Sequence, residues 1–356
     1  MSGTTPPRAV MEGGGSYNRH AMHQAAGMSV TLPLLERAAR DVSLDSLDHP
    51  VVIADYGSSQ GKNSLRPMRI AIGVLRERLC LETPISLVHT DLPGNDFSTL
   101  FHLLEADPDS YIRDQPNVFA YAVGRSFYES VFPPNSIILG WSAYAILWLS
   151  RLPTLIPGHF YTTRSSGTIL DAFNRQADED WRTFLSLRAR ELRHGGRLVI
   201  VVSARDSEGL HGIEPLMDHA NAVLGEMVDQ GFIKADERER IMLPAHPKSR
   251  TDLLAPFNES GHFEGLLVEH CEVFAGLDPV WEAYQEHQDP EILAAQHARF
   301  FRATFGPTLA SALEKSREAE EVIAFNDRLE QGLKRCVAGD LREMKAMLGT
   351  MIIAKP

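Results

Sequence analysis

Two short turns could bind a ligand, because each directly follows a run typical of a buried strand. Asp55-Tyr-Gly57-Ser-Ser-Gln-Gly61 follows the apolar run at 50–55, and Asp91 ends a second run at 85–90. Glycines let the backbone turn sharply and come close to a ligand, and the next helix presents its N-terminus there. The Asp91 carboxylate can accept both hydroxyls of a ribose. The pattern indicates a nucleoside cofactor, but it lacks the GxGxxG spacing of dinucleotide sites. The alternatives are an ordinary glycine-rich turn and, at Asn95 or Asp96, a helix N-cap.

A third candidate is the aromatic stretch from Trp141 to Ser150. Tyr144 and Trp148 are four residues apart, so we expect them on one face of a helix. An indole N–H is a single donor on a large apolar plate, so Trp148 can bind an anion while lining an apolar pocket. Ordinary core packing is the alternative for two aromatic residues at this spacing.

The stretch from Ser16 to Gln24 puts polar side chains beside a tail at 1–15 that is rich in Gly, Pro, Thr and Ser. It is placed to form a lid over a site. His20 and His23 have the spacing of a metal pair, but no acidic third ligand and no HExxH motif accompany them, so we predict no metal site. The sequence also has no G-x-S-x-G elbow and no P-loop, which removes support for serine hydrolase and NTP hydrolase functions.

Composition excludes several classes of protein. The 356 residues carry a net charge of 35 − 47 = −12, which opposes binding to a phosphate backbone, so we expect no nucleic-acid partner. No run approaches the ~18 apolar residues of a membrane span, so we expect no membrane association. The N-terminus lacks the apolar region of a signal peptide. Three dispersed cysteines (Cys80, Cys271, Cys336) suit a reducing compartment, and we expect a cytoplasmic protein.

The elements that must position these residues alternate between strand and helix, which predicts an open α/β sheet. Strands are predicted at 50–55, 85–90, 117–124, 136–138, 197–203, 262–273 and 350–354. Helices are predicted at 64–78, 97–104, 172–192, 291–313 and 318–337, with two helical pieces between 16 and 42. The stretch 206–252 is helical and polar. We therefore expect a flexible tail at 1–15, an α/β core at 16–205 and 259–356, and a helical cap at 206–258.

Taken together, the motifs resemble the SABATH family of methyltransferases. The glycine turn also looks like the first motif of class I S-adenosylmethionine methyltransferases. The family patterns S-Y-x-x-x-S-x-x-Q, A-D-L-G-C-S-S-G-x-N-T and D-L-P-x-N-D-F-x-x-x-F correspond to stretches starting at Ser16, Ala54 and Asp91. The patterns G-S-F-Y-x-x-x-F-P-x-x-S and S-S-x-S-L-x-W-L-S-x-x-P are echoed from Gly124 and Trp141. The matches run in order from about residue 16 to 260.

The resemblance implies a Rossmann-like class I methyltransferase core with a helical cap, S-adenosylmethionine as cofactor, and a homodimer. Position by position, it implies these cofactor-binding residues: Tyr17, Gln24, Asp55, Gly57, Ser58, Asn63, Asp91, Leu92, Ser126 and Phe127. The implied acceptor-site residues are Tyr17, Gln24, Tyr144, Leu147, Trp148 and, in the cap, Met217. Gln24 and the Trp148 indole would grip the acceptor carboxylate as the catalytic pair.

The chain departs from the family pattern at Ala21, Ser58, Leu147 and Met217, where a Ser, a Cys, a His or Met, and a Trp are usual. These exchanges affect the acceptor pocket more than the methyl-donor site. We expect methyl ester formation on a small aromatic or apolar carboxylic acid. N-methylation of a purine-like heterocycle and non-catalytic S-adenosylmethionine binding are the alternatives.

Overall fold

The computed structural model describes residues 11–13, 15–20, 22–44, 51–113 and 115–356. Within them, eight strands form one sheet in the order β3-β2-β1-β4-β5-β8-β7-β6. Their bounds are β1 Val51–Tyr56, β2 Ile85–Asp91, β3 Val118–Gly124, β4 Ile137–Ala143, β5 Leu192–Ser203, β6 His262–Phe263, β7 Leu266–Ala275 and β8 Met347–Lys355. Strands β1 to β5 are parallel to one another, whereas β8 runs antiparallel to both of its neighbours, β5 and β7. The predicted open α/β sheet is confirmed.

Continuous apolar runs make the central strands. Ile53 and Ala54 of β1 and the run from Leu198 to Val202 of β5 are fully buried, as expected for parallel strands covered on both faces. The register between β1 and β2 pairs Asp55 with His89 and Tyr56 with Thr90. Both strands therefore end at the same edge of the sheet, where the glycine turn and Asp91 follow.

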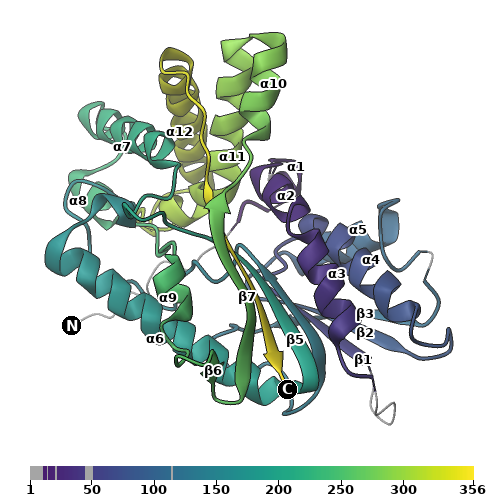
Figure 1. The fold of residues 1–356 in the computed structure, drawn as a ribbon. Helices are drawn as coiled ribbons and strands as arrows, with labels where there is room; N and C mark the ends of the chain where they lie inside the picture. The colour runs from purple at the N-terminus through teal and green to yellow at the C-terminus, as the bar shows by residue number, and fades with distance from the viewer. Residues whose placement is uncertain (1–10, 14, 21, 45–50, 114) are drawn as a thin grey trace.

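Helices cover both faces of the sheet and rise above one edge of it (Figure 1). On one side lie α3 (Leu32–Asp41), α4 (Lys62–Arg76) and α5 (Phe97–Ala106), and on the other lie α6 (Gly167–Glu191) and α9 (Arg250–Leu254). The upper group consists of α7 (Glu214–Asp229), α10 (Pro279–His287), α11 (Pro290–Ala310) and α12 (Ala319–Gly339), with α8 (Ala235–Arg240) beside them. The short elements are α1 (Ser16–His20), α2 (Met22–Ser29) and a 3₁₀ turn at Thr162–Arg164.

The packing of the upper helices can be compared with the predicted extent of the cap. Helix α12 packs against both α7 and α11, so the helices above the sheet come from two stretches of the chain, 214–240 and 279–339. The sequence-based cap at 206–258 contains only the first stretch. We therefore propose a cap built from both, on a core formed by the sheet and its flanking helices. Most of the tail predicted at 1–15 lies outside the described residues.

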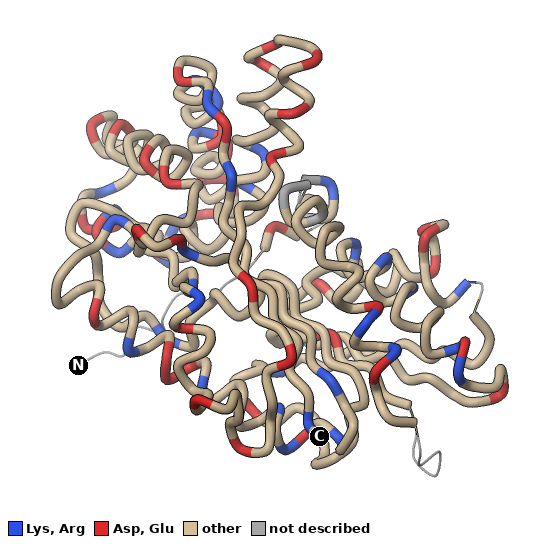
Figure 2. The backbone as a smooth tube through the Cα atoms, viewed as in Figure 1, with Lys and Arg blue, Asp and Glu red and all other residues tan. Residues whose placement is uncertain are grey.

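Charged side chains lie mainly on the outer helices and loops, while the central strands carry few (Figure 2). Helix α10, for example, carries Glu282 and Glu286 and no Lys or Arg. No helix of the described chain is long and apolar enough to cross a membrane.

Candidate active site

The glycine turn, residues 57–61, connects β1 to α4 through backbone conformations that favour glycine. Gly57 and Gly61 have φ angles of 87° and 88°, and Ser59 has 49°. A Cβ on Gly57 would lie 2.3 Å from the Cβ of Ala145, so no larger residue fits between the turn and the loop after β4. The backbone N–H groups of Gly57 and Ser58 donate to the Thr90 carbonyl at 2.8 and 3.0 Å. The turn is thereby fixed to the end of β2.

The side chain of Asp55 is occupied by protein groups below the turn. Its Oδ2 accepts the Ser64 hydroxyl at 2.6 Å and lies 2.8 Å from His89 Nδ1, and His89 Nε2 lies 2.8 Å from the Tyr111 hydroxyl. All of these side chains are buried. Asp55 thereby ties the end of β1 to the start of α4, and its predicted contact with the cofactor stays a prediction.

Asp91 stands at the end of β2, beside the turn. One carboxylate oxygen accepts the Ser59 backbone N–H and the other accepts that of Leu92, both at 2.7 Å. A carboxylate has about four acceptor positions, so two remain for the hydroxyls of a ribose. Burial raises the pKa of Asp91 to about 6, which outweighs the lowering by these backbone hydrogen bonds, and the group is mainly ionised at pH 7. The predicted helix N-cap also exists, because Asp96 accepts from Thr99 N–H at the start of α5.

The aromatic loop, residues 126–132 after β3, forms the next side of the site around the glycine turn. Phe127 reaches the turn, because its Cε1 lies 3.9 Å from where a Cβ of Gly57 would stand. Its ring packs edge-on against Tyr128 and Phe184, with centroids 4.7 and 5.9 Å away. Leu92 follows β2 directly and Asn63 lies in the first turn of α4, and both are half-buried. Predicted cofactor residues from three separate stretches, 55–63, 91–92 and 126–127, therefore meet at one edge of the sheet.

The prediction of a helix over Tyr144 and Trp148 is wrong. Tyr144 has a φ of 55°, outside the helical range, and residues 147–149 pair instead with the chain at 244–246. His246 N–H donates to the Leu147 carbonyl at 2.8 Å, and Leu149 N–H donates to that of Pro244 at 2.7 Å. Backbone pairing with a distant segment overrides the helical spacing. Tyr144 and Trp148 still reach the same cavity, as neighbours on an irregular loop.

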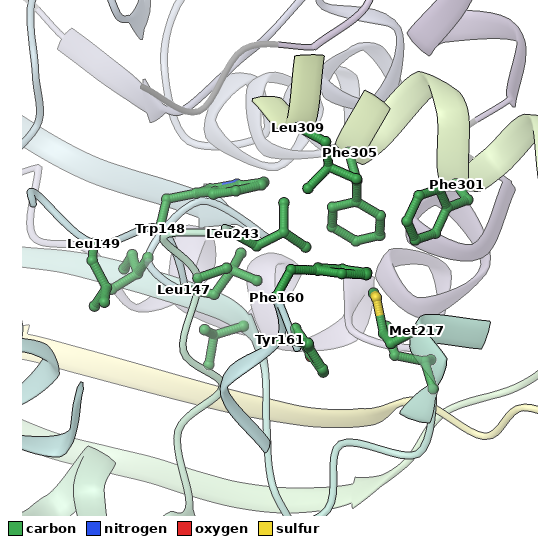
Figure 3. Packing of buried hydrophobic residues seen from close by; sticks show 14 of the residues in the cluster. Leu147, Trp148, Leu149, Phe160, Tyr161, Met217, Leu243, Phe301, Phe305 and Leu309 are labelled. Atoms are coloured by element: carbon green, nitrogen blue, oxygen red, sulfur yellow. The ribbon is translucent and has the colours of Figure 1, made fainter. Parts of the chain in front are cut away.

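An apolar cavity, which we call the acceptor cavity, lies between the sheet edge and the upper helices. Figure 3 shows the packing of buried apolar side chains in this region, among them the lining residues Leu147, Trp148, Tyr161 and Phe305. The cavity is lined by Met11, Gln24, Gly27, Tyr144, Leu147, Trp148, Tyr161, Ser203, His211, Ile213, Leu216, Ala245, Gly276, Leu277, His297, Phe300, Thr304, Phe305, Met344, Ala346 and Leu348. The predicted acceptor residues Gln24, Tyr144, Leu147 and Trp148 are among them. The side chain of Tyr17 and all of Ala21 lie outside the described part of the chain, so their roles stay predictions.

Met217 does not line this cavity. It is fully buried in α7 and lies near Phe160 and Phe301 in the packed core, whereas its neighbour Leu216 faces the cavity. The sequence-based placement of Met217 in the acceptor site is therefore shifted by one position along α7.

Gln24 is the polar group at the α2 wall of the acceptor cavity. It is 6% exposed, its Nε2 lies 3.5 Å from the Thr304 hydroxyl, and its Oε1 has no hydrogen-bond partner among the described residues. A buried amide with an unmet oxygen and a weak donor contact is costly without a ligand. Because Gln24 lines the same cavity as Trp148, a polar group of a ligand in the cavity could satisfy its amide.

Sequence reasoning identified four of the 21 residues of the cavity wall and missed the rest. Tyr161, His211, His297, Phe300 and Thr304 line it from segments that carry no recognised motif. Nothing in the sequence distinguished His211 and His297 from the other histidines among the 14 in the chain. Only the tertiary fold brings the end of β5, the cap helices and the start of β8 to one point.

The chain between Met11 and Ser29 joins the two sites. Glu12 N–H donates to the Ala303 carbonyl of α11, and the Glu12 carbonyl accepts Gln60 Nε2 of the glycine turn at 2.6 Å. The Glu12 carboxylate also pairs with Arg302 at 2.9 Å. Asn18 bonds the Gln60 carbonyl and the Lys62 N–H, each at 3.3 Å. This N-terminal segment has the position expected for a lid.

Comparison with known proteins identifies the family to which this chain belongs. Residues 8–348 match the family described as SAM dependent carboxyl methyltransferase. This chain belongs to that family. The resemblance seen in the motifs is confirmed, and so are the enzyme class and S-adenosylmethionine as cofactor.

Individual relatives agree with the family. A salicylate carboxymethyltransferase of Clarkia breweri is 31% identical over 279 residues, covering 74% of this chain and 75% of the relative. An anthranilate O-methyltransferase of Zea mays is 26% identical over 336 residues, covering 85% and 86%. The solved structure of a loganic acid methyltransferase with SAH covers 97% of this chain and 98% of its own, with a TM-score of 0.73 at 21% identity. The class I methyltransferase fold is therefore confirmed.

The residues at the sheet edge fit such a cofactor. Asp91 stands beside the glycine turn and retains two acceptor positions that suit the hydroxyls of a ribose. Within the described chain no group of three or more His, Cys, Asp and Glu side chains could hold a metal ion.

Proposed function

We propose that this methyltransferase forms methyl esters of small carboxylic acids with an aromatic or apolar body. The observation that carries the proposal is the acceptor cavity itself: its wall is mainly apolar, and the buried Gln24 amide and Trp148 both belong to that wall. An apolar wall suits an aromatic body, and the two donors suit a carboxylate.

The chemistry needs no general base, because a carboxylic acid with a pKa near 4 is ionised at pH 7. S-adenosylmethionine supplies an electrophilic methyl group on a sulfonium. The task of the protein is to hold one carboxylate oxygen in line with that methyl and to remove water from it. We assign the orientation of the carboxylate to the Gln24 amide and the Trp148 indole. We assign the exclusion of water to Leu147, Phe300 and Phe305, which line the same cavity.

The cofactor would be held by the glycine turn, by Asp91 at its ribose, and by Leu92, Ser126 and Phe127 around its base. Asp55 would act through Ser64 and His89, which it holds below the turn. The loop after β4 connects the two sites, because Ala145 touches the turn while Trp148 lines the cavity. Family membership favours carboxyl methylation over the alternatives of N-methylation and non-catalytic binding.

The test is methyl transfer from labelled S-adenosylmethionine to a panel of acids: benzoate, salicylate, cinnamate, indole acetate, farnesoate and a fatty acid, with xanthosine as the nitrogen control. We expect a base-labile, organic-extractable product from at least one acid. Label on xanthosine alone, or cofactor binding without label on any acid, would contradict the proposal.

We further propose a homodimer and a cytoplasmic location. The homodimer rests on the family resemblance, and the location on the three dispersed cysteines, which are free thiols in the structure. Light scattering distinguishes a monomer of 39.6 kDa from a particle of twice that mass.

A further inference from the structure

His211 is a buried histidine whose ring reaches the acceptor cavity from the loop between β5 and α7. It is 5% exposed and lines the cavity. Its Nδ1 lies 2.6 Å from the Tyr161 hydroxyl, and its Nε2 has no hydrogen-bond partner within the described chain. A buried ring nitrogen left without a partner is costly, and such a nitrogen on a cavity wall points to a ligand.

The backbone fixes this ring firmly. His211 N–H and Gly212 N–H donate to the two carboxylate oxygens of Glu214, each at 2.7 Å. The His211 carbonyl accepts Met347 N–H at 2.7 Å. A Cβ on Gly212 would lie 2.1 Å from the Lys345 carbonyl oxygen, so this loop is pressed against the start of β8. The ring is therefore held in place before any ligand binds.

The hydrogen-bond pattern assigns the proton on this ring. The Tyr161 hydroxyl is buried, and within the described chain Nδ1 is its one recorded acceptor, so we place the phenolic proton between them with Tyr161 donating. Burial lowers the pKa of His211 to about 4 and raises that of Tyr161, so both groups are neutral at pH 7. A neutral imidazole that accepts at Nδ1 carries its proton at Nε2. His211, a residue of the cavity wall, therefore carries at Nε2 a proton that no described group accepts.

The nearby charge restricts what this donor can bind. Burial tends to raise the pKa of Glu214, but the hydrogen bonds it accepts from His211 N–H and neighbouring groups lower it overall, so Glu214 is ionised. A second carboxylate beside His211 would meet this negative charge. A neutral acceptor oxygen would not.

His211 and Trp148 act on different parts of a ligand. Figure 3 shows the Trp148 ring apart from the ring of Tyr161, whose hydroxyl contacts His211. A carboxylate at Trp148 therefore leaves the His211 donor for a group elsewhere on the acceptor.

We infer that the acceptor acid carries an uncharged oxygen, such as an ether, carbonyl or hydroxyl, remote from its carboxylate, and that His211 Nε2–H binds it and selects for it. This inference rests on the proposed function, since it names the substrate class of the same site. His211 is a specificity-determining residue and takes no part in methyl transfer.

The test uses pairs of acids in which an ether oxygen replaces a methylene group at equal size. Suitable pairs are 3- and 4-methoxybenzoate against the ethylbenzoates, 4-methoxyphenylacetate against 4-ethylphenylacetate, and 4-methoxycinnamate against 4-ethylcinnamate. Both kcat/KM and the affinity for the protein saturated with S-adenosylhomocysteine are measured. We expect at least one methoxy acid to be preferred by about tenfold, the effect of one buried neutral hydrogen bond.

The variants separate the donor from the fold. His211→Phe should abolish the preference, measured as the ratio of the methoxy to the ethyl acid within the same variant, and His211→Gln, which keeps a donor, should retain part of it. His270→Phe on the half-exposed strand β7 is the matched control and should keep it all. If His211→Phe fails to bind S-adenosylhomocysteine, Tyr161→Phe/His211→Phe replaces it, because that double variant leaves no buried hydroxyl without an acceptor.

A preference that survives in His211→Phe, or the absence of any preference in wild type in both measurements, would overturn the inference. The proposed function fails separately: acids that bind with the expected preference but are never methylated would refute ester formation and leave the role of His211 standing. Acids that are methylated without any preference for the methoxy member would refute the role of His211 and leave ester formation standing.

Discussion

At the scale of single residues, the groups that would touch ligands are held by groups that would not. Asp55 fixes the glycine turn through Ser64 and His89, and Tyr128 donates to the Trp148 carbonyl at 2.7 Å. This second contact ties the aromatic loop beside the cofactor site to the acceptor cavity. The side chains facing ligands can therefore be changed with limited effect on the frame, which makes their roles separable by mutation.

Trp148→Phe keeps an aromatic plate and removes the indole donor, and Gln24→Met keeps the length of the side chain and removes the amide. A hydrogen bond to a charged group is worth about 1.5–3 kcal/mol, so kcat/KM for the best acid should fall about 10- to 100-fold in each variant. Affinity for S-adenosylhomocysteine, measured by calorimetry, should change less than about threefold. Trp281→Phe on α10, away from the cavity, is the control. Unchanged kcat/KM in both variants would contradict the assignment of the carboxylate grip.

Asp91 should make cofactor affinity depend on pH. Ribose hydroxyls donate best to the ionised carboxylate, whose pKa burial raises to about 6. Lowering the pH through 6 protonates the group and should weaken binding of S-adenosylhomocysteine, while affinity should level off above about pH 7. Asp91→Asn should bind about 10- to 100-fold more weakly at pH 7 and lose this dependence. The exposed Asp109→Asn should behave as wild type. A calorimetric pH profile that is the same in Asp91→Asn and wild type would refute the ribose contact.

At the scale of elements, local patterns predict what local physics decides. The β-branched runs at 50–55 and 197–203 predict β1 and the second half of β5, because a parallel strand buried on both faces must be apolar throughout. The helix expected at Tyr144 fails because Pro244 and His246 pair with that loop across about a hundred residues of chain, which no local spacing reveals. Helix α10 was not predicted, although Asp278 caps it and Pro279 starts it. The cofactor edge was therefore largely predictable, since it lies next to motifs, whereas the cap side of the cavity was not.

The contact between α6 and the aromatic loop gives a prediction about stability. Arg188 and Glu191 form an ion pair that is 0% and 2% exposed, Arg188 donates to the carbonyls of Phe127 and Glu129, and Glu191 accepts from Val131 and Phe132 N–H. Removing one partner leaves a buried charge, so Arg188→Met should lower the free energy of unfolding by about 3–5 kcal/mol.

The matched control lies on the same helix. Arg182 pairs with Asp178 one turn apart, and both are about half exposed, so Arg182→Met should cost less than about 1 kcal/mol. Denaturant titration followed by circular dichroism measures both variants. Equal destabilisation of the two would show that the buried pair does not secure the aromatic loop.

At the scale of the whole molecule, the acceptor cavity is closed by the sheet edge, the upper helices and the N-terminal segment together. Gln24 of that segment faces the acceptor cavity, while Asn18 and Glu12 bond to the glycine turn. A ligand in either site therefore bears on the same stretch of chain. If binding at one site orders this stretch, the second ligand meets a segment that is already ordered and should bind more tightly.

Coupling between the two ligands should depend on Gln60, whose amide donates to the Glu12 carbonyl at 2.6 Å. The affinity for the best acid, measured by calorimetry with and without S-adenosylhomocysteine, gives the coupling factor, and the same factor must appear for S-adenosylhomocysteine with and without acid. Gln60→Met keeps the buried volume and removes the bond, so the coupling factor should fall about three- to tenfold, the effect of one neutral hydrogen bond. Glu36→Gln, which breaks an exposed ion pair with Arg40 on α3, should leave it unchanged. A coupling factor in Gln60→Met equal to that of wild type would mean that the segment closes over each site independently.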